Sequence, residues 1–325
     1  RIHQDFVRAG ARLVGAHRER YAAVVQRLAE LTTVFGQNVL HDESDYMLEL
    51  RDDTAAAGLP RFVRDAAAQA AADRGLCGRM VITLSRSLVL SFLTFSHHRD
   101  LREQVWRAWV GRGERTGEHD NRPIAREILA LRREQAELLG HACYADHALA
   151  DTMALTRERV WALLDEVWQR ALPAWEQERE LLVEAMRAAG VDHALQPWDW
   201  RYWAEQVRQS RFALDESELK PYFALDAMVR ALFECAQRLF GLHFTHRPDL
   251  RAYHPDVQAY EVSGQGGETI GLFLHDNFSR PGKRSGAWMS ALRWQHRNAA
   301  GGGRSQPIIL NNNNFAKAPP GEPTL

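Results

Sequence analysis

Apolar residues recur at helical spacing along the first two thirds of the chain. Val24, Leu28, Leu31 and Phe35 fall at i, i+4, i+7 and i+11, which places them on one face of a helix. Gly36 follows directly and is expected to weaken the end of that helix. Similar stripes predict helices over 101–110 and 124–139, the second of which is closed by Gly140.

Two further apolar stripes each predict a helix, one the longest in the chain and the other the most regular. The longer begins after Thr156, should kink at Pro173 and should end at Gly190; its apolar face consists of Val160, Leu163, Leu164, Val167, Trp168, Leu172 and Trp175. The more regular one follows Pro221, ends before Gly241, and carries Leu225, Met228, Val229, Leu232, Phe233, Ala236, Leu239 and Phe240. Upstream of it, 215–218 reads as a capping box. Such a succession of helices predicts a layered helical body.

The pattern changes to short β-rich segments after Gly241. Val257–Val262 and Thr269–Leu274 flank Gly-Gln-Gly-Gly, which predicts a hairpin, and Pro307–Leu310 is a third candidate strand. Gly301–Gly303 reads as a flexible loop. We therefore predict a mainly α protein, with a large multi-helix body over 1–241 and a small antiparallel sheet within 242–325.

The composition excludes some classes of binding partner but does not indicate a function. The 325 residues hold 41 Lys and Arg against 42 Asp and Glu, a formal charge of −1, so neither nucleic acid nor an anionic membrane is an expected partner. The longest apolar stretch, Met80–Phe95, is too short and too polar to span a bilayer. The three cysteines, Cys77, Cys143 and Cys235, are far apart, which favours isolated buried thiols in a reducing cytoplasm.

None of the 14 histidines begins the His-Glu-x-x-His motif of a zinc peptidase. His97 and His98 are adjacent and would diverge on a helix, and the spacing of His141 and His147 around Cys143 fits no common metal site. The remaining grouping, in which a metal role is less favoured than ordinary hydrogen bonding, is His243, His246 and His254.

Three other groupings have a functional and a plainer interpretation. The carboxylates of Glu176, Glu180 and Glu184 share one helix face, with Glu178 beside them, and favour a solvated surface over a two-metal or acid–base site. The tryptophans at 198, 200 and 203 favour helix packing over an aromatic ligand wall. A basic run favours hydrated side chains over an anion site; it consists of Arg280, Lys283, Arg284, Arg293 and Arg297.

The segment Ser285, Gly286, Ala287 and Trp288 stands out because small residues precede a large aromatic one. Small side chains leave the backbone open to another chain, so an extended peptide could add here as a strand. A plain turn or a tight packing contact is the alternative from the residues alone.

The chain as a whole resembles the M3 zinc oligopeptidases, the group that includes the peptidyl-dipeptidases, oligopeptidase A and thimet oligopeptidase. The resemblance is carried, in order, by 35–40, 82–87, 92–96, 120–122, 128–132, 212–223, 239–242, 253–257, 271–289 and 307–325. It implies a soluble, monomeric, cytoplasmic peptidase of two helical lobes that hydrolyses short unstructured peptides, in one subgroup by releasing C-terminal dipeptides. On that reading, 242–325 begins the catalytic lobe.

The resemblance also implies a Zn²⁺ cofactor whose ligands this chain does not supply. The family holds zinc with the His-Glu-x-x-His helix and a later Glu, all expected beyond Leu325, so the chain by itself should bind no catalytic zinc and cleave nothing. Ser285–Trp288 matches the strand that aligns substrate in related zinc peptidases. The adjacent Asn311–Phe315 is expected to be sheet core, although four consecutive asparagines are unusual in a strand. Two alternatives remain, a non-catalytic helical peptide-binding module and a purely structural scaffold.

Overall fold

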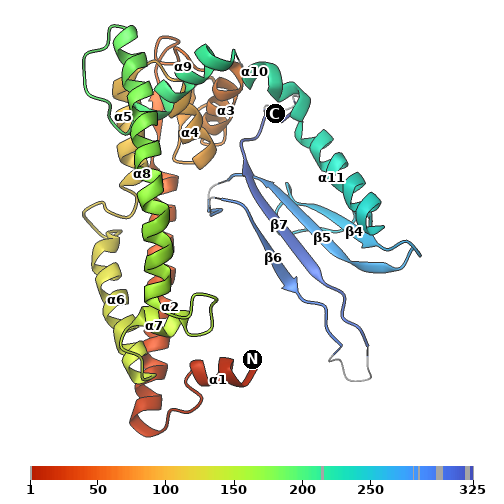
Figure 1. Ribbon diagram of the computed structural model, residues 1–325. Coiled ribbons are helices and arrows are strands. Elements are labelled where there is room, and N and C mark those ends of the chain that lie inside the picture. The colour runs from red at the N-terminus through yellow and green to blue at the C-terminus, as the bar shows by residue number, and fades with distance from the viewer. Residues whose placement is uncertain are drawn as a thin grey trace. The chain divides into compact units, whose positions relative to one another are not determined.

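A computed structural model describes residues 2–213, 216–280, 282–284, 286–297, 303–318 and 323–324, and most of them are helical (Figure 1). This confirms the mainly α prediction. The helices are α1 (Ile2–Arg8), α2 (Gly15–Asp45), α3 (Arg61–Ala72), α4 (Arg86–Phe95), α5 (Arg99–Val110), α6 (Asn121–Leu138), α7 (Tyr144–Leu149), α8 (Arg157–Ala188), α9 (Trp200–Phe212), α10 (Glu216–Leu219), a 3₁₀ turn (Lys220–Phe223) and α11 (Leu225–Phe240). The predicted capping box at 215–218 lies partly outside the described residues.

The chain forms two compact units, each assembled from segments far apart in sequence. The first unit joins Arg1–Asp45 to Val110–Leu195, and the second joins Tyr46–Trp109 to Gln196–Leu325. The change from helix to strand after Gly241 occurs where the sequence predicts it. Whether 1–241 and 242–325 act as separate domains stays a prediction.

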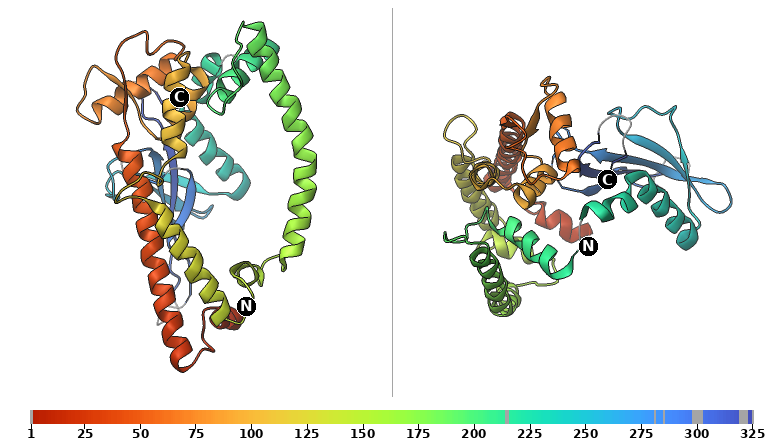
Figure 2. Two further views of the ribbon diagram at one scale, coloured as in Figure 1. Left: turned by 90° about the vertical axis from the view of Figure 1, so that its left-hand side faces the viewer. Right: turned by 90° about the horizontal axis from the view of Figure 1, so that it is seen from above.

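In the first unit, α2 and α6 lie side by side, as the views in Figures 1 and 2 agree. Val24 and Leu31 are buried in this packing, and Asn38 Nδ2 donates to Asn121 Oδ1 at 2.9 Å. The expected weakening at Gly36 is wrong, because α2 continues to Asp45. The buried Asp42 accepts a hydrogen bond of 2.7 Å from the Gly113 amide, and such contacts outweigh the cost of about 1 kcal/mol for a helical glycine.

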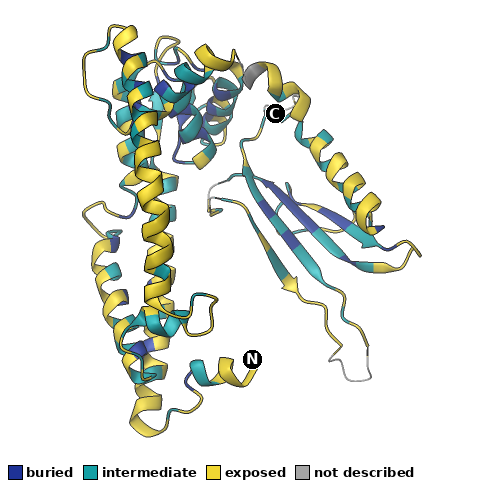
Figure 3. Ribbon diagram, in the orientation of Figure 1, coloured by how far each residue is buried: buried dark blue, intermediate teal, exposed yellow. Residues whose placement is uncertain are grey.

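The long helix α8 has the predicted bounds but an exposed apolar face. Thr156 caps its first turn, Pro173 does not end it, and Gly190 follows it with a φ of +75°. Leu163 and Trp168 are 63% and 62% exposed, and Figure 3 shows exposed residues along most of the helix. The stripe is therefore amphipathic, as predicted, yet nothing in the described structure buries it.

The helical part of the second unit surrounds one apolar core. Its centre holds Val63, Ile82, Leu84, Val89, Phe92, Leu93 and Val105. They come from α3–α5, from β2 (Met80–Ile82), which pairs antiparallel with β1 (Leu48–Leu50), and from the segment between β2 and α4. Trp198 and Trp203 are 7% and 8% exposed, and the Trp198 ring lies 5.6 Å from that of Trp106. Trp198 and Trp203 therefore pack against the helices, as the sequence favoured, whereas Trp200 is half-buried and lines a pocket with Trp106 and Trp109.

The second unit also contains a five-stranded sheet, formed by β3 (His243–His246), β4 (Gln258–Ser263), β5 (Thr269–Phe278), β6 (Trp288–Arg293) and β7 (Ile308–Phe315). The strand order is β3-β4-β5-β7-β6. The predicted β4–β5 hairpin and the third strand are confirmed. The sheet is mixed rather than wholly antiparallel, because the chain runs from β5 out to the edge as β6 and returns as β7, parallel to β5.

The two faces of this sheet are covered differently. On one face, Phe233 of α11 stacks on Phe244 of β3 with ring centroids 4.2 Å apart and contacts Tyr260 of β4. Gly241 ends α11 with a φ of +66°, as the sequence predicts. The opposite face buries an apolar cluster that includes Leu274 and Leu310. It also carries the polar residues described below.

Two expectations from composition have different outcomes. The cysteines form no disulfide with one another, but the expected burial is wrong for Cys77 and Cys235, which are exposed on helical or loop surfaces. Among the described helices, none combines the length and apolar character that crossing a bilayer requires. Residues 301 and 302 of the predicted glycine loop lie outside the described residues.

Candidate functional site

Three side chains lie in a row across β5, β7 and β6, at the side of the sheet that ends in the edge strand β6. The strand register pairs Asp276 of β5 with Asn312 of β7, and Asn312 in turn with Trp288 of β6. Because partners in a ladder point to the same face, all three side chains lie on the face opposite α11. Alternation along β5 and β7 thus brings a carboxylate, an amide and an indole together beside the sheet's edge.

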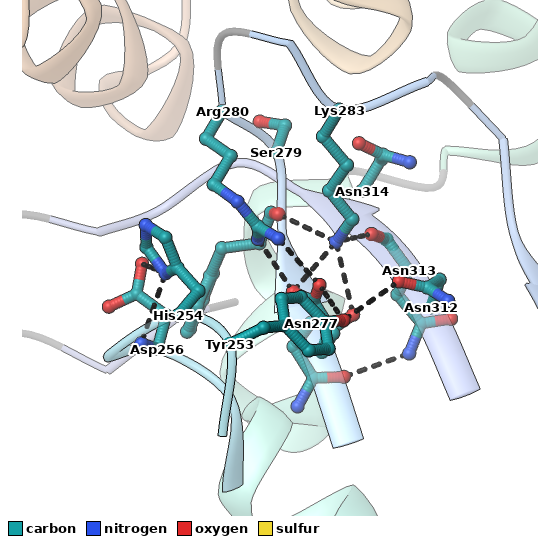
Figure 4. Close-up of polar contacts among 12 residues, drawn as sticks. Tyr253, His254, Asp256, Asn277, Ser279, Arg280, Lys283, Asn312, Asn313 and Asn314 are labelled. Atoms are coloured by element: carbon teal, nitrogen blue, oxygen red, sulfur yellow. Dashed lines mark hydrogen bonds and ion pairs between the residues drawn. The ribbon is translucent and has the colours of Figure 1, made fainter. Parts of the chain in front are cut away.

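Asp276 is fully buried and accepts hydrogen bonds from three charged or phenolic donors. Arg280 binds both carboxylate oxygens at 2.7 and 2.8 Å, and Lys283 Nζ donates to Oδ1 at 2.9 Å. The Tyr253 hydroxyl donates to Oδ2 at 2.6 Å. Figure 4 shows Arg280 and Lys283, from the segment after β5, converging with Tyr253, from the segment before β4. A bidentate arginine and a buried ammonium make this carboxylate the centre of a fixed charged cluster.

The cluster shifts the pKa values of its members in directions that geometry explains. Burial by itself would raise the pKa of Asp276, but the hydrogen bonds from its three partners outweigh burial and hold that pKa well below the ordinary value. Burial, followed by the hydrogen bond to Asp276, raises the pKa of Tyr253 to about 12. Burial lowers the pKa of Lys283 despite its contact with the carboxylate. The hydrogen bonds of the cluster therefore favour an ionised Asp276 carboxylate and a protonated Tyr253 phenol.

The consecutive asparagines of β7 connect this cluster to the chain leading into β6. With its amide oriented to satisfy both neighbours, Asn312 donates to Asp276 Oδ2 and accepts from Trp288 Nε1, each at 3.2 Å. Asn314 Nδ2 donates to the carbonyls of Arg284 and Gly286 at 3.0 and 2.6 Å. Lys283 Nζ also donates to the carbonyl of Phe278 at 2.8 Å. The asparagines, unusual in a strand, thus serve as side-chain bridges.

The strand that these bridges hold, β6, pairs on one side only. It ends the strand order next to β7, so its other edge has no strand partner among the described residues. Of the predicted contact segment, Ser285 lies outside the described residues, Gly286 has a φ of +96°, Ala287 is exposed and Trp288 begins β6 half-buried. The edge leaves backbone N–H and C=O groups open to an added strand.

The other candidates from sequence do not assemble into a site. His243 and His246 lie on β3, whereas His254 lies in the following loop, where its Nδ1 accepts from the Asp256 amide at 3.2 Å. No group of three or more metal-ligating side chains occurs within the part of the chain that the structure describes. The residues present therefore do not fit a zinc site. Glu180 and Glu184 are exposed on α8, as the solvated interpretation predicted.

For the basic run, the favoured interpretation of hydrated side chains is wrong at two positions. Arg280 and Lys283 pair with the buried Asp276, and the Lys283 side chain is only 5% exposed. Sequence reasoning missed Asp276 and Tyr253 altogether. A signal was available, since Asp276 interrupts an apolar strand pattern at a position where alternation places it among the inward-facing residues.

Comparison with known proteins places the chain in a family. The model for peptidase family M3 matches residues 92–325. The chain is 34% identical to the dipeptidyl carboxypeptidase of Escherichia coli over all of its length and 47% of that protein, and 34% identical to oligopeptidase A of the same organism over 99% of the chain and 48% of that protein. It is 33% identical, over 89% of its length and 42% of the relative, to a probable cytosolic oligopeptidase A of Arabidopsis thaliana.

The chain belongs to peptidase family M3. It spans about half the length of the curated relatives that it matches.

Proposed function

We propose that the chain is part of a zinc-dependent M3 oligopeptidase that hydrolyses short peptides, and that β6 aligns the substrate. The observation that carries this proposal is the one-sided pairing of β6, whose entry is fixed by Asn314 and by the Asp276 cluster, in a chain of this family. Gly286, Ala287 and Trp288, together with Ser285, are the proposed substrate contacts. The substrate needs no particular sequence, because its backbone makes the hydrogen bonds to β6.

The proposal assigns the metal to a part of the enzyme outside this chain. The curated relatives are about twice as long, and the apolar face of α8 is exposed, which is consistent with a further part of the protein covering it. Zinc would supply the polarising Lewis acid and the activated water. The residues described here would bind and orient the peptide beside it. The name of one relative, a probable cytosolic oligopeptidase A, supports a cytoplasmic enzyme.

Strand addition at β6 should be weak and tolerant of sequence. A peptide that makes about four backbone hydrogen bonds gains about 0.5–1.5 kcal/mol from each, against an association cost of about 4 kcal/mol or more. The two contributions nearly cancel, so binding of a peptide to this chain alone should be weak. Short unstructured peptides suit the edge because they lose little structure on becoming extended.

Hydrogen exchange on the 325-residue chain tests the binding step. An uncharged short peptide at millimolar concentration should slow amide exchange in 286–293. The same peptide with alternate N-methylated amides on its bonding edge should not, because it cannot donate the ladder bonds. Equal protection by both peptides, or protection confined to α11 and β3, would contradict strand addition at β6.

The catalytic part of the proposal has a separate test. The chain alone should carry no stoichiometric zinc by metal analysis and should not cleave a quenched fluorescent peptide. Clear hydrolysis by the isolated chain would refute the assignment of the zinc ligands elsewhere. If the gene encodes a His-Glu-x-x-His helix downstream, the peptidase proposal gains over a non-catalytic peptide-binding module; a motif with its Glu or His replaced would favour that module.

A further inference from the structure

The Asp276 cluster also forms the wall of a pocket beside the open edge. The pocket has a volume of about 410 Å³ and is lined by Tyr253, Asp276, Arg280, Gly282, Lys283, Arg284, Trp288, Leu310 and Asn312. Its aromatic and apolar members lie on the face opposite α11. It is therefore a concave surface at the point where a strand added to β6 would pass Trp288.

The charges around this pocket do not balance. Its lining contains one carboxylate, that of Asp276, and three cations, those of Arg280, Lys283 and Arg284. Asp276 already serves the first two cations through short hydrogen bonds. Two positive charges remain in excess, and repulsion from Arg280 contributes to the lowered pKa of Lys283. An anion entering the pocket would relieve this imbalance.

Arg284 is the cation best placed to meet such an anion. Its guanidinium lies 4.9 Å from the centroid of the Trp288 ring, its side chain is exposed, and it has no carboxylate partner in the described part of the chain. Stacking on the indole holds the guanidinium in place while leaving its N–H groups free to donate in the plane. The Trp288 ring is itself held through Asn312 to Asp276.

Register determines which substrate group reaches the pocket. In an antiparallel or parallel addition to β6, the peptide residue opposite Trp288 points to the same face as Trp288, with the two Cβ atoms about 5 Å apart. Its neighbours point to the other face. We propose that this pocket binds the carboxylate of an aspartate or glutamate side chain, and so gives the β6 edge a preference for an acidic residue at one position of the peptide. This rests on the proposed binding of peptide at β6.

Fluorescence anisotropy with labelled, C-terminally amidated peptides tests the preference on the 325-residue chain. Peptides that differ only by Glu, Gln or Lys at one position are scanned along the sequence. Glu should bind about fivefold more tightly than Gln at low salt, at one position and not at its immediate neighbours. Lys should bind more weakly than Gln. The Glu advantage should shrink as salt is raised, because the pocket is open to solvent.

Two arginine variants separate the pocket from general positive charge. Arg284→Ala should remove the Glu advantage, so that the Glu and Gln peptides bind this variant equally. Arg297→Ala, which alters another exposed arginine of the basic run outside the pocket lining, should leave the Glu advantage intact.

Each outcome decides between the two proposals. Equal affinity for Glu and Gln peptides, with both bound, would refute the acidic pocket but keep the peptide edge. Equal loss of the Glu advantage in the two arginine variants would also refute it. Failure of all peptides to bind or to protect 286–293 would refute the edge, and the pocket proposal with it.

Discussion

Replacing Asp276 by asparagine should loosen the sheet edge without changing its shape. The wild-type carboxylate is fully buried and holds Arg280 and Lys283, whose side chains are 19% and 5% exposed. Removing one partner of a buried ion pair leaves an uncompensated charge and typically costs about 3–5 kcal/mol. Because asparagine keeps the side-chain volume and one acceptor, we expect Asp276→Asn to destabilise the sheet edge by about 3 kcal/mol. This corresponds to about two orders of magnitude in the equilibrium constant for local opening.

Native-state hydrogen exchange of segments from β5, β6 and β7 measures that loss where it occurs. Asp249→Asn serves as the matched control, because Asp249 also binds an arginine, at 2.7 Å, but is 60% exposed, and it should cost less than about 1 kcal/mol. If Asp276→Asn exchanged no faster than Asp249→Asn in these strands, the buried cluster would not be holding the edge.

The pH dependence of the same difference gives an independent test. The pKa of Asp276 is depressed in the folded state, so its stabilisation is fully present above its ordinary value of 3.8 and is lost as pH falls through the depressed folded value. The difference in opening free energy between wild type and Asp276→Asn should therefore be constant near neutral pH and should decrease below about pH 3.8. A gap that persisted unchanged in strong acid would mean that the carboxylate charge is not its source.

Three further predictions concern other parts of the second unit. Arg102→Met should lower the free energy of unfolding in urea by about 3–5 kcal/mol, because Arg102 is 3% exposed and pairs with the fully buried Asp199 at 3.0 Å. Arg107→Met on the same helix should lower it by less than about 1 kcal/mol. Similar losses in the two variants would contradict the burial argument. Phe233→Ala should cost about 2 kcal/mol and raise exchange in β3 first, since its ring stacks there; slow exchange in β3 would count against α11 covering that face. The pKa of Tyr253 is raised to about 12, so the stabilisation that its phenol contributes is present below the ordinary pKa of 10 and is lost as pH rises through about 12. Spectrophotometric titration should show this late-ionising phenol in the wild type and not in Tyr253→Phe.

Local periodicity was sufficient for the helices because their cause is local. The stripe from Leu225 to Phe240 runs the length of α11, and the glycine after it ends the helix as predicted. The same reasoning failed at Gly36, where helix propensity opposes continuation. What carries α2 onward is the contact of Asp42 with Gly113, a residue 71 positions away, and no local pattern encodes such a partner.

The candidate site was predictable only in part for the same reason. The small residues before Trp288 predict a contact segment, and its role in binding substrate stays a prediction; β6 itself has no clear alternation of apolar and polar residues. The Asp276 cluster depends on partners contributed by β7 and by the loop before β4, so it appears only when the strand register is known. A basic run in isolation is usually hydrated, and it takes one buried carboxylate to reverse that interpretation.

An open edge strand is useful for binding a peptide and hazardous for a soluble protein, because it also pairs with copies of itself. Two β6 edges meeting antiparallel about their centre would set Arg284 of one chain opposite Arg297 of the other. Like charges at such positions disfavour pairing by up to about 1 kcal/mol per contact, twice in a symmetric pair. An uncharged or acidic peptide meets no such repulsion. We infer that the arginines flanking β6 keep the edge unpaired and, at the Arg284 end, select what binds to it.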